Sequence, residues 1–348
     1  MVAVSENASL ELVGGELPSP AVPFSVTSLF AGCGGLDLGF RGDFSVIGRS
    51  YRRLPFALRW ANDFNPRACE SYAENLGAHV RCGDIREILR NPSEYGMPPH
   101  SDVVTGGFPC QAFSLSGKRL GFDDPRGQLY LSMRETVDRL KPKVFVAENV
   151  KGLLSHDGGS AFRTIVGEFE ELGYAVTWKL YKAMEYGVPQ TRERVLVVGT
   201  RIGVLPAFEH PSSSPGIPLV SAKEALGDLE DVPWDGVPNH RWAKCKKTNG
   251  QGNGTIRADA PAPTMRAEHH GNIEFHYSLG RRLSAREAAR IQTFPDDFVL
   301  RRSATDAYRQ VGNAVPPVLA WHLARALAAF LVSNGHSGTP CDVESFRS

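Results

Sequence analysis

Short apolar runs alternate with helical stretches between residue 23 and about residue 200. The apolar runs predict strands at Ser25–Phe30, Ala57–Asn62, Val103–Gly106, Val144–Glu148, Val176–Tyr181 and Val195–Gly199. The stretches between them predict helices that include Pro66–Asn75, Gln128–Leu140 and Ser160–Leu172. This alternation is typical of an α/β fold in which a mostly parallel sheet is flanked by helices.

The pattern changes after Arg201. Residues 206–280 are rich in Pro, Gly, Ser and Asn, which predicts loops on a few short strands, a small separate domain. Ser284 and Glu287 form a capping-box pattern for a helix at Ala285–Gln292, and a last helix follows at Val318–Val332. We therefore expect a loose arm at 1–22, a main domain at 23–204, a small domain at 205–300, a return to the main domain at 301–335 and a flexible tail at 336–348. The boundary near 280–300 stays open.

Composition narrows the class of protein. The chain has 348 residues, 42% of them hydrophobic and 22% charged, which is enough for a sizeable core and excludes general disorder. No apolar run approaches the roughly 18 residues of a membrane span, and the first 20 residues lack the basic start of a signal peptide. The six cysteines contain no paired CxxC spacing, so we expect no metal site and a reducing, cytoplasmic compartment.

Positive charge gathers in one part of the chain. The net charge is only +1, but the segment Gly236–Arg302 holds twelve Lys or Arg against six acidic residues. Such an excess indicates contact with a polyanion on one side of the protein, and an ordinary solvated basic face is the alternative.

A glycine-rich segment, Ser28–Phe40, follows the first predicted strand. Glycines at the carboxyl end of a strand let a ligand approach the backbone closely, although a tight turn would need them as well. The segment matches neither the dinucleotide nor the triphosphate loop pattern. Asp63 and Asp84 follow the next predicted strands, where carboxylates suit a ribose diol and an adenine amino group. Each of them alone could instead be a helix cap.

Three further motifs carry candidate chemistry. Cys110 lies just past a strand, where its thiolate could be activated, although most free cysteines are buried and inert. Residues 111–127 resemble a mobile lid or an ordinary loop. Glu148 ends a buried strand and needs a partner or caps a helix. Arg192 and Arg194 share one face of a strand, suited to a phosphate or a carboxylate or to surface ion pairs.

In this order the motifs resemble the bacterial DNA (cytosine-5)-methyltransferases of the restriction-modification type. The resemblance covers about 28–200 and 281–325. It depends on six ordered blocks: Phe-x-Gly-x-Gly-Gly, Pro-Cys-Gln, Glu-Asn-Val, Gln-x-Arg-x-Arg, Arg-Glu-Ala-Ala-Arg-Ile-Gln-Thr-Phe-Pro and Gly-Asn-Ala-Val-Pro-Pro. It implies the Rossmann-like class I S-adenosylmethionine methyltransferase fold, with a small, mostly irregular or β target-recognition domain in the variable segment.

The resemblance also implies the site. Cys110 would attack carbon 6 of a flipped cytosine, Glu148 would bind ring nitrogen 3 and the exocyclic amine, Arg194 would hold the base carbonyl or a phosphate, and Arg192 would support Glu148 or the backbone. S-adenosylmethionine would be bound by Phe30, Ala31, Gly32, Gly34, Gly35, Leu36, Asp63, Phe64, Asp84, Ile85, Pro109, Asn313 and Val315. Duplex DNA would be contacted by Gln111, Ser114, Ser116, Lys118, Arg126, Arg257, Thr264 and Arg266.

Two alternatives remain open at this level, a catalytically silent DNA-binding relative and an RNA cytosine methyltransferase. The first is disfavoured because Cys110, Glu148 and both arginines are present. The second is disfavoured because Ala-Phe-Ser follows Pro-Cys-Gln, unlike the Pro-Phe-Thr of the tRNA-modifying branch. Asp63 departs from the Glu that the family often carries there. We expect a monomer whose partner can be a cognate restriction endonuclease acting on the same site.

Overall fold

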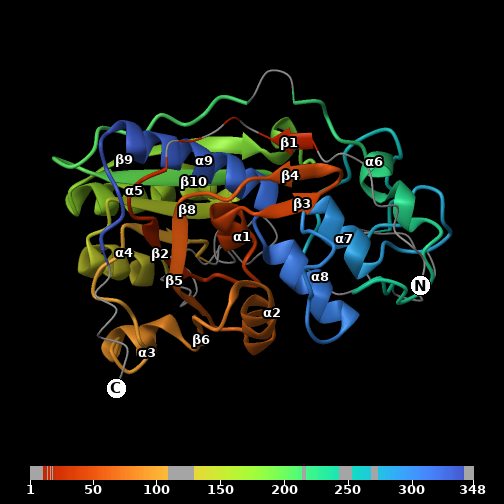
Figure 1. Ribbon diagram of the computed structural model, residues 1–348, viewed down its shortest axis with the longest axis horizontal. Helices are drawn as coiled ribbons and strands as arrows, with labels where there is room; N and C mark the ends of the chain where they lie inside the picture. Colours follow the sequence, from red (N-terminus) through yellow and green to blue (C-terminus); the bar gives the residue numbers. More distant parts are fainter. Residues whose placement is uncertain are drawn as a thin grey trace.

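The main sheet has seven strands. The computed structural model describes residues 11–13, 15, 17, 19–108, 129–213, 217–242, 253–267 and 273–340. The strands are β2 (Phe24–Leu29), β5 (Phe56–Asp63), β6 (Val80–Cys82), β7 (Val103–Gly106), β8 (Val144–Val150), β9 (Tyr174–Lys182) and β10 (Glu193–Arg201), in the spatial order β6-β5-β2-β7-β8-β10-β9 (Figure 1). The first five in this order are parallel to their neighbours, whereas β10 is antiparallel to both β8 and β9.

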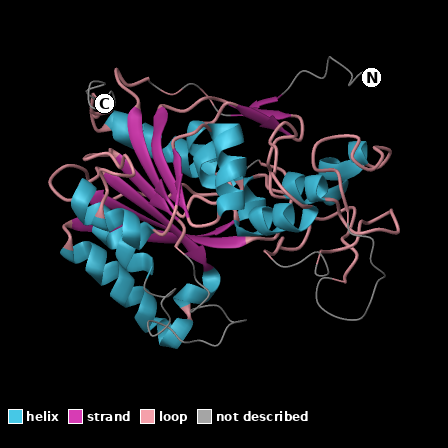
Figure 2. Ribbon diagram, turned by 90° about the horizontal axis from the view of Figure 1, so that it is seen from below, coloured by secondary structure: helices cyan, strands magenta, loops and turns pink. Residues whose placement is uncertain are grey.

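Helices cover both faces of this sheet (Figure 2). The helices of the described residues are α1 (Gly35–Arg41), α2 (Pro66–Leu76), α3 (Ile85–Arg90), α4 (Leu129–Leu140), α5 (Ser160–Glu171), α6 (Ala222–Leu226), α7 (Ala285–Ile291), α8 (Ala304–Asn313) and α9 (Pro317–Ser333). Of these, α6, α7 and α8 lie beside the sheet (Figure 1). Alternate side chains of β8 enter two hydrophobic cores on opposite faces of the sheet. Val144 and Val146 lie in the core beneath α1 and α9, and Phe145 lies in the core beneath α4 and α5. The predicted α/β fold is confirmed.

The predicted N-terminal arm contains regular structure. Strand β1 (Glu11–Val13) pairs in parallel with β4 (Arg49–Tyr51), which pairs antiparallel with β3 (Phe44–Val46). The expectation of a loose arm over 1–22 is therefore wrong at Glu11–Val13. Backbone pairing holds so short a strand, and it leaves almost no hydrophobic pattern by which the sequence could indicate it.

The predicted tail is docked at its start. The backbone N–H of Gly338 donates to the carbonyl of Val22 at 2.8 Å, and the Thr339 hydroxyl donates to Asp102 at 2.8 Å. Burial alone would raise the pKa of Asp102, but hydrogen bonds from Lys143, Ser25 and Thr339 lower it to about 2. The expectation of a flexible tail from residue 336 is therefore wrong for 336–340.

The start of the predicted small domain belongs to the main body. The Thr177 hydroxyl on β9 donates to the carbonyl of Phe208 at 3.0 Å, and the Phe208 ring packs against Phe330 of α9. Within the described part of 205–300, the regular structure is helical (α6 and α7), and β contacts are isolated bridges such as Thr255 to Phe275. The part of this segment that contains α6 and α7, which we call the small lobe, lies beside the sheet and next to α8 (Figure 1).

One helical stretch, Ala304–Ser333, is long and apolar enough to cross a membrane by length and composition. This differs from the expectation that no apolar run approaches that length. Its most apolar window is 67% buried inside the protein, and α9 packs against α1 in the core. A core helix accounts for the same pattern.

Candidate active site

The predicted site residues meet along one edge of the sheet. Asp84 follows β6, Asp63 ends β5, Phe30 follows β2, Phe108 follows β7 and Glu148 lies near the end of β8. These five strands are neighbours and run in parallel, so their carboxyl ends form a continuous row. The carboxyl edge of a parallel sheet is where open α/β folds bind ligands.

The glycine-rich loop after β2 requires unusual backbone conformations. Phe30, Gly32 and Gly34 have positive φ angles of 53°, 57° and 96°. A Cβ atom at Gly34 would lie 2.2 Å from the Leu76 side chain, and one at Gly35 would lie 2.4 Å from the carbonyl oxygen of Val315. These glycines therefore let the loop pack tightly on α2 and on the turn before α9, which brings two predicted cofactor segments together.

Asp63 and Phe64 form an acceptor and an aromatic surface beside this loop. The Asp63 carboxylate accepts a hydrogen bond from the N–H of Gly32 at 2.7 Å and one from the N–H of Asn65 at 2.8 Å. Burial raises the pKa of Asp63, and the two N–H groups oppose that rise. The Phe64 side chain is 76% exposed, and a Cβ atom at Gly32 would meet nothing within 4 Å. This open cradle fits an adenosine group.

The remaining described residues that were predicted to bind the cofactor lie in different environments. Asp84 is the N-cap of α3, accepting from the N–H of Arg86 at 2.9 Å, and its carboxylate also pairs with the Arg86 guanidinium, which lowers the pKa of Asp84. Ile85 is buried in the core and Asn313 is exposed at the end of α8. Ala31 and Leu36 lie in the loop and the first turn of α1.

Glu148 and Arg194 form an ion pair between two adjacent strands. Nε of Arg194 lies 2.7 Å from Oε1 of Glu148, and the two side chains are 12% and 11% exposed. The antiparallel register of β8 and β10 places Arg194 opposite Val150, two residues beyond Glu148. The arginine predicted to hold the base thus holds the carboxylate, an arrangement that aims Glu148.

The end of β7 leads toward this ion pair. A Cβ atom at Gly107 would lie 2.8 Å from Oε2 of Glu148, and the Asn149 amide donates to the Phe108 carbonyl at 3.2 Å. The predicted residues of the next segment lie outside the described residues: Pro109, Cys110, Gln111, Ser114, Ser116, Lys118 and Arg126.

Arg192 is bound to the backbone rather than to Glu148. It is 1% exposed and donates to the carbonyl oxygens of Met265 (2.9 Å), Gly312 (2.9 Å) and Ala314 (3.0 Å). Burial lowers the pKa of Arg192, and the charge of Arg194 adds to that effect. Of the two roles expected for Arg192, support of the backbone is the one that these contacts match.

Two buried glutamines that the sequence analysis did not single out complete this junction. Gln190 accepts from the N–H of Met265 at 2.8 Å and contacts Gln292, whose amide donates to the carbonyl of Ala314 at 2.6 Å. Both glutamines are 0% exposed. Their membership of the Gln-x-Arg-x-Arg and Ile-Gln-Thr-Phe-Pro blocks was the available signal, but no local pattern reveals contacts across 100 residues.

An open cavity of about 290 Å³ lies beside the ion pair. It is lined by Val150, Lys151, Gly152, Thr191, Glu193, Arg194 and Thr264. One wall belongs to the sheet and the other to the predicted recognition segment. Its volume is close to the lower end of the roughly 300–1,000 Å³ found for ligand sites.

Half of the twelve basic residues in the predicted basic segment form ion pairs. Six of the arginines in Gly236–Arg302 pair with acidic side chains: Arg241 with Asp235, Arg257 with Asp259, Arg281 with Glu287, Arg290 with Asp228 and Asp296, Arg301 with Glu74 and Arg302 with Glu70. Several of these acids lie outside the segment, so a local charge count could not include them. Lys244, Lys246 and Lys247 lie outside the described residues. These arginines already have acidic partners, so the positive charge that this segment offers to a polyanion is smaller than the sequence count indicates.

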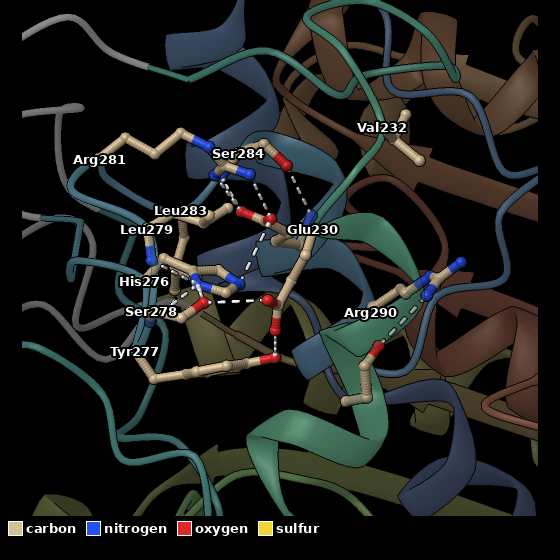
Figure 3. A network of polar contacts seen from close by, with 12 residues as sticks. Glu230, Val232, His276, Tyr277, Ser278, Leu279, Arg281, Leu283, Ser284 and Arg290 are labelled. Atoms are coloured by element: carbon tan, nitrogen blue, oxygen red, sulfur yellow. Dashed lines mark hydrogen bonds and ion pairs between the residues drawn. The ribbon is translucent and has the colours of Figure 1, made fainter.

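A polar network stiffens the small lobe (Figure 3). Arg281 pairs with Glu287 through two contacts of 2.8 Å, and Glu287 also accepts from the N–H of Ser284 at 2.6 Å. Nδ1 of the buried His276 accepts from the N–H groups of Ser278 and Leu279, so this nitrogen carries no proton. Burial lowers the pKa of His276, and the nearby Glu287 carboxylate opposes that effect.

The comparisons with known proteins now identify the family. The sequence model of one protein family, the C-5 cytosine-specific DNA methylases, matches residues 24–252 and 220–329 of this chain. The chain belongs to this family. The predicted identity as a DNA (cytosine-5)-methyltransferase is confirmed, and the enzyme acts on DNA.

Individual relatives agree with the family. The Type II methyltransferase M.NgoFVII of Neisseria gonorrhoeae is 37% identical over 89% of this chain and 87% of its own length. The Type II methyltransferase M.FnuDI of Fusobacterium nucleatum is 36% identical over 86% of this chain and 93% of its own. A solved structure of a protein encoded within an E. coli prophage is similar in fold, with a TM-score of 0.67, 23% identity and coverage of 89% of this chain and 99% of that one.

Proposed function

We propose that this methyltransferase uses S-adenosylmethionine to methylate carbon 5 of one cytosine within a specific short duplex sequence, as the modification enzyme of a restriction-modification system. The observation that carries the proposal is the ion pair of Glu148 with Arg194. It lies beside a cavity and beside the strand end that continues into Pro-Cys-Gln.

The cofactor would occupy the cradle formed by the glycine-rich loop, Asp63 and Phe64. S-adenosylmethionine supplies the methyl group. Asp63 would accept a hydrogen bond from a ribose hydroxyl, since the N–H groups of Gly32 and Asn65 already hold its carboxylate in place. The exposed Phe64 ring would stack on the adenine. Asp84 would accept from the adenine amine in exchange for a contact that its carboxylate now makes with the Arg86 guanidinium.

Cys110 would be the nucleophile. Cys110 follows Phe108 by two residues in the sequence, and the Phe108 carbonyl accepts a hydrogen bond from Asn149, the residue after Glu148. The thiolate would bond to carbon 6 and shift an electron pair to carbon 5, which then accepts the methyl group. Carbon 5 would next lose its proton to a base, and the bond between carbon 6 and sulfur would break, releasing Cys110.

Glu148 would bind the Watson–Crick edge of the base. A cytosine inside the duplex cannot reach this site, so it must leave the stack. Glu148 would then hydrogen-bond nitrogen 3 and the exocyclic amine and stabilise the charge that develops during attack. Arg194 would hold the carboxylate in the direction that this contact requires. Residues 111–127 would cover the base and exclude water.

The biological setting follows from the relatives, several of which are named Type II methyltransferases. We propose that the enzyme protects host DNA in the cytoplasm and nucleoid, acts as a monomer, and can be accompanied by an endonuclease that cuts the same sequence. Target recognition would reside mainly in residues 217–283, because residues 205–211 pack on β9 of the main body. Thr264, Arg257 and Arg266 would be among its DNA contacts.

Methyl transfer from radiolabelled S-adenosylmethionine to a mixed-sequence plasmid and to tRNA tests the proposal. We expect label in the plasmid and none in the tRNA, and bisulfite sequencing should locate it at one recurring short sequence. Label in tRNA alone would favour the RNA alternative. Absence of label from both substrates, with folded protein, would favour a silent DNA-binding relative.

A further inference from the structure

The cavity that Arg194 lines has one wall at the ends of β8 and β10 and another from a distant part of the chain. Thr191, Glu193 and Arg194 form one wall at the start of β10, and Thr264 contributes to the other. Thr264 belongs to a segment without regular secondary structure. The distance between the walls therefore depends on whatever holds the backbone next to Thr264.

Arg192 and Gln190 hold that backbone on both sides of the adjacent residue. Gln190 accepts from the N–H of Met265 at 2.8 Å, and Arg192 donates to the carbonyl of Met265 at 2.9 Å. A backbone bridge from Gln190 to Ala262 adds to these contacts. Since Thr264 precedes Met265 directly, its position is fixed relative to the sheet.

The same guanidinium binds the turn before α9. Arg192 donates to Gly312 at 2.9 Å and Ala314 at 3.0 Å, so one buried side chain joins three carbonyls from two segments. The segments are pressed together here, because a Cβ atom at Gly312 would lie 2.2 Å from the backbone of Arg266 and Ala267. Little slack remains for the recognition segment to move away.

We propose that Arg192 is a positioning residue that sets the width of the cavity receiving the extruded cytosine. This inference rests on the proposed function. Arg192 does not touch the reacting atoms in this account. It holds Thr264 and Arg194 at a fixed separation, so that the base fits between the two walls once it leaves the stack.

The chemistry of arginine suits this task. A planar guanidinium offers five donors in fixed directions and can bond three carbonyls at once, whereas the shorter, compact ammonium of lysine cannot reproduce that spacing. Arg192→Lys should therefore keep the charge but loosen the second wall. A loosened cavity binds the extruded base less well, and the equilibrium between stacked and extruded cytosine shifts toward the stack.

The test compares two duplexes that carry the target sequence. In one the target cytosine is paired with guanine, and in the other it lies opposite a mismatched base, which lowers the cost of extrusion. Single-turnover methylation rates are measured for each variant at saturating enzyme and cofactor and divided by the wild-type rate on the same duplex. We expect the relative rate of Arg192→Lys to be about 100-fold below 1 on the paired duplex. On the mismatched duplex its relative rate should be at least about tenfold higher than on the paired one.

Arg286 provides a matched control. It is also fully buried and donates to three carbonyls, those of Pro238 (2.9 Å), Pro295 (2.7 Å) and Phe298 (2.7 Å), but it does not line the cavity. Arg286→Lys should lower stability in a comparable way, measured by thermal unfolding. Its relative rate should be the same on both duplexes.

Thr264→Ala provides a second variant, because it shortens the wall without removing a buried arginine. It should show the same recovery on the mismatched duplex, and it carries the test alone if Arg192→Lys does not fold. If Arg192→Lys has the same relative rate on both duplexes, the inference is overturned. If Arg192→Lys does not fold, the same result for Thr264→Ala overturns it. Wild-type enzyme that methylates neither duplex would instead overturn the proposed function, and the inference would fall with it.

Discussion

The guanidinium of Arg194 holds the carboxylate of Glu148 from the neighbouring strand, with 2.7 Å between Nε and Oε1. Both side chains are nearly buried, so each charge depends on the other for compensation. This contact gives Glu148 a fixed direction at the end of β8, next to Gly107 and the cavity.

Replacing the carboxylate tests that relationship. Glu148→Gln should slow methyl transfer by orders of magnitude, because an amide cannot share a proton with nitrogen 3 of the cytosine. It should also cost roughly 3–5 kcal/mol of unfolding free energy, because it removes the negative charge from a nearly buried ion pair. Rates and denaturant unfolding measure the two effects. The exposed pair of Glu135 with Arg139 supplies the control, since Glu135→Gln should change neither quantity appreciably. A Glu148→Gln enzyme with a tenth of wild-type activity would contradict the assigned role.

Two substitutions at Asp84 distinguish a cofactor contact from a helix cap. Asp84→Ala removes both, and the lost cap alone should cost about 1 kcal/mol of stability. Asp84→Asn keeps a good cap but replaces one acceptor by a donor. Calorimetry should show S-adenosylmethionine binding weakened by roughly 1–3 kcal/mol in both variants. Wild-type affinity in Asp84→Asn would show that the residue only caps α3.

Exchange of the recognition segment tests where specificity lies. Residues 217–283 taken from a relative with another target should transfer that target, while the chemistry stays unchanged. Bisulfite sequencing of plasmid from expressing cells identifies the methylated site. Exchange of residues 205–213 alone is the control and should leave the target unchanged, because this segment packs on β9. An active chimera of 217–283 that keeps the original target would place specificity elsewhere.

The burial of His322 should make the folded protein less stable as the pH falls. Its ring lies between Tyr186 and Trp321, and burial, with a smaller contribution from the Arg325 charge, lowers its pKa to about 4. Below the ordinary pKa near 6.5 the unfolded chain binds a proton that the folded chain does not, so stability falls as pH decreases toward 4. His322→Phe should reduce this slope by about 1 kcal/mol per pH unit between pH 6 and 4.5. An unchanged slope in denaturant titrations would contradict the assignment.

The sequence predicted the parts of the fold that depend on local pattern. Strands such as Val103–Gly106 are buried on both faces, and the resulting apolar runs are visible without a structure. The capping box at Ser284 and Glu287 was also predicted correctly, because its contacts span three residues. In contrast, β1 and β6 are too short to carry a hydrophobic pattern.

The site was predictable as a set of motifs but not as a set of contacts. The sequence indicates that Glu148, Arg192 and Arg194 belong together, yet it cannot show which arginine faces the carboxylate. That division depends on the register between β8 and β10 and on carbonyls more than 70 residues away. The acidic partners of Arg301 and Arg302 were hidden for the same reason, since Glu74 and Glu70 lie on α2, far away in the sequence.

The proposed reaction depends most on Cys110 acting as the nucleophile. The most direct measurement is incubation with S-adenosylmethionine and a target duplex in which the cytosine carries fluorine at carbon 5, followed by denaturing electrophoresis and mass spectrometry. Fluorine blocks the elimination that frees the enzyme, so wild type should form a denaturant-resistant adduct at Cys110, and Cys110→Ser should form none while still binding the cofactor. Methylation of the ordinary duplex without any adduct on the fluorinated one would contradict the account.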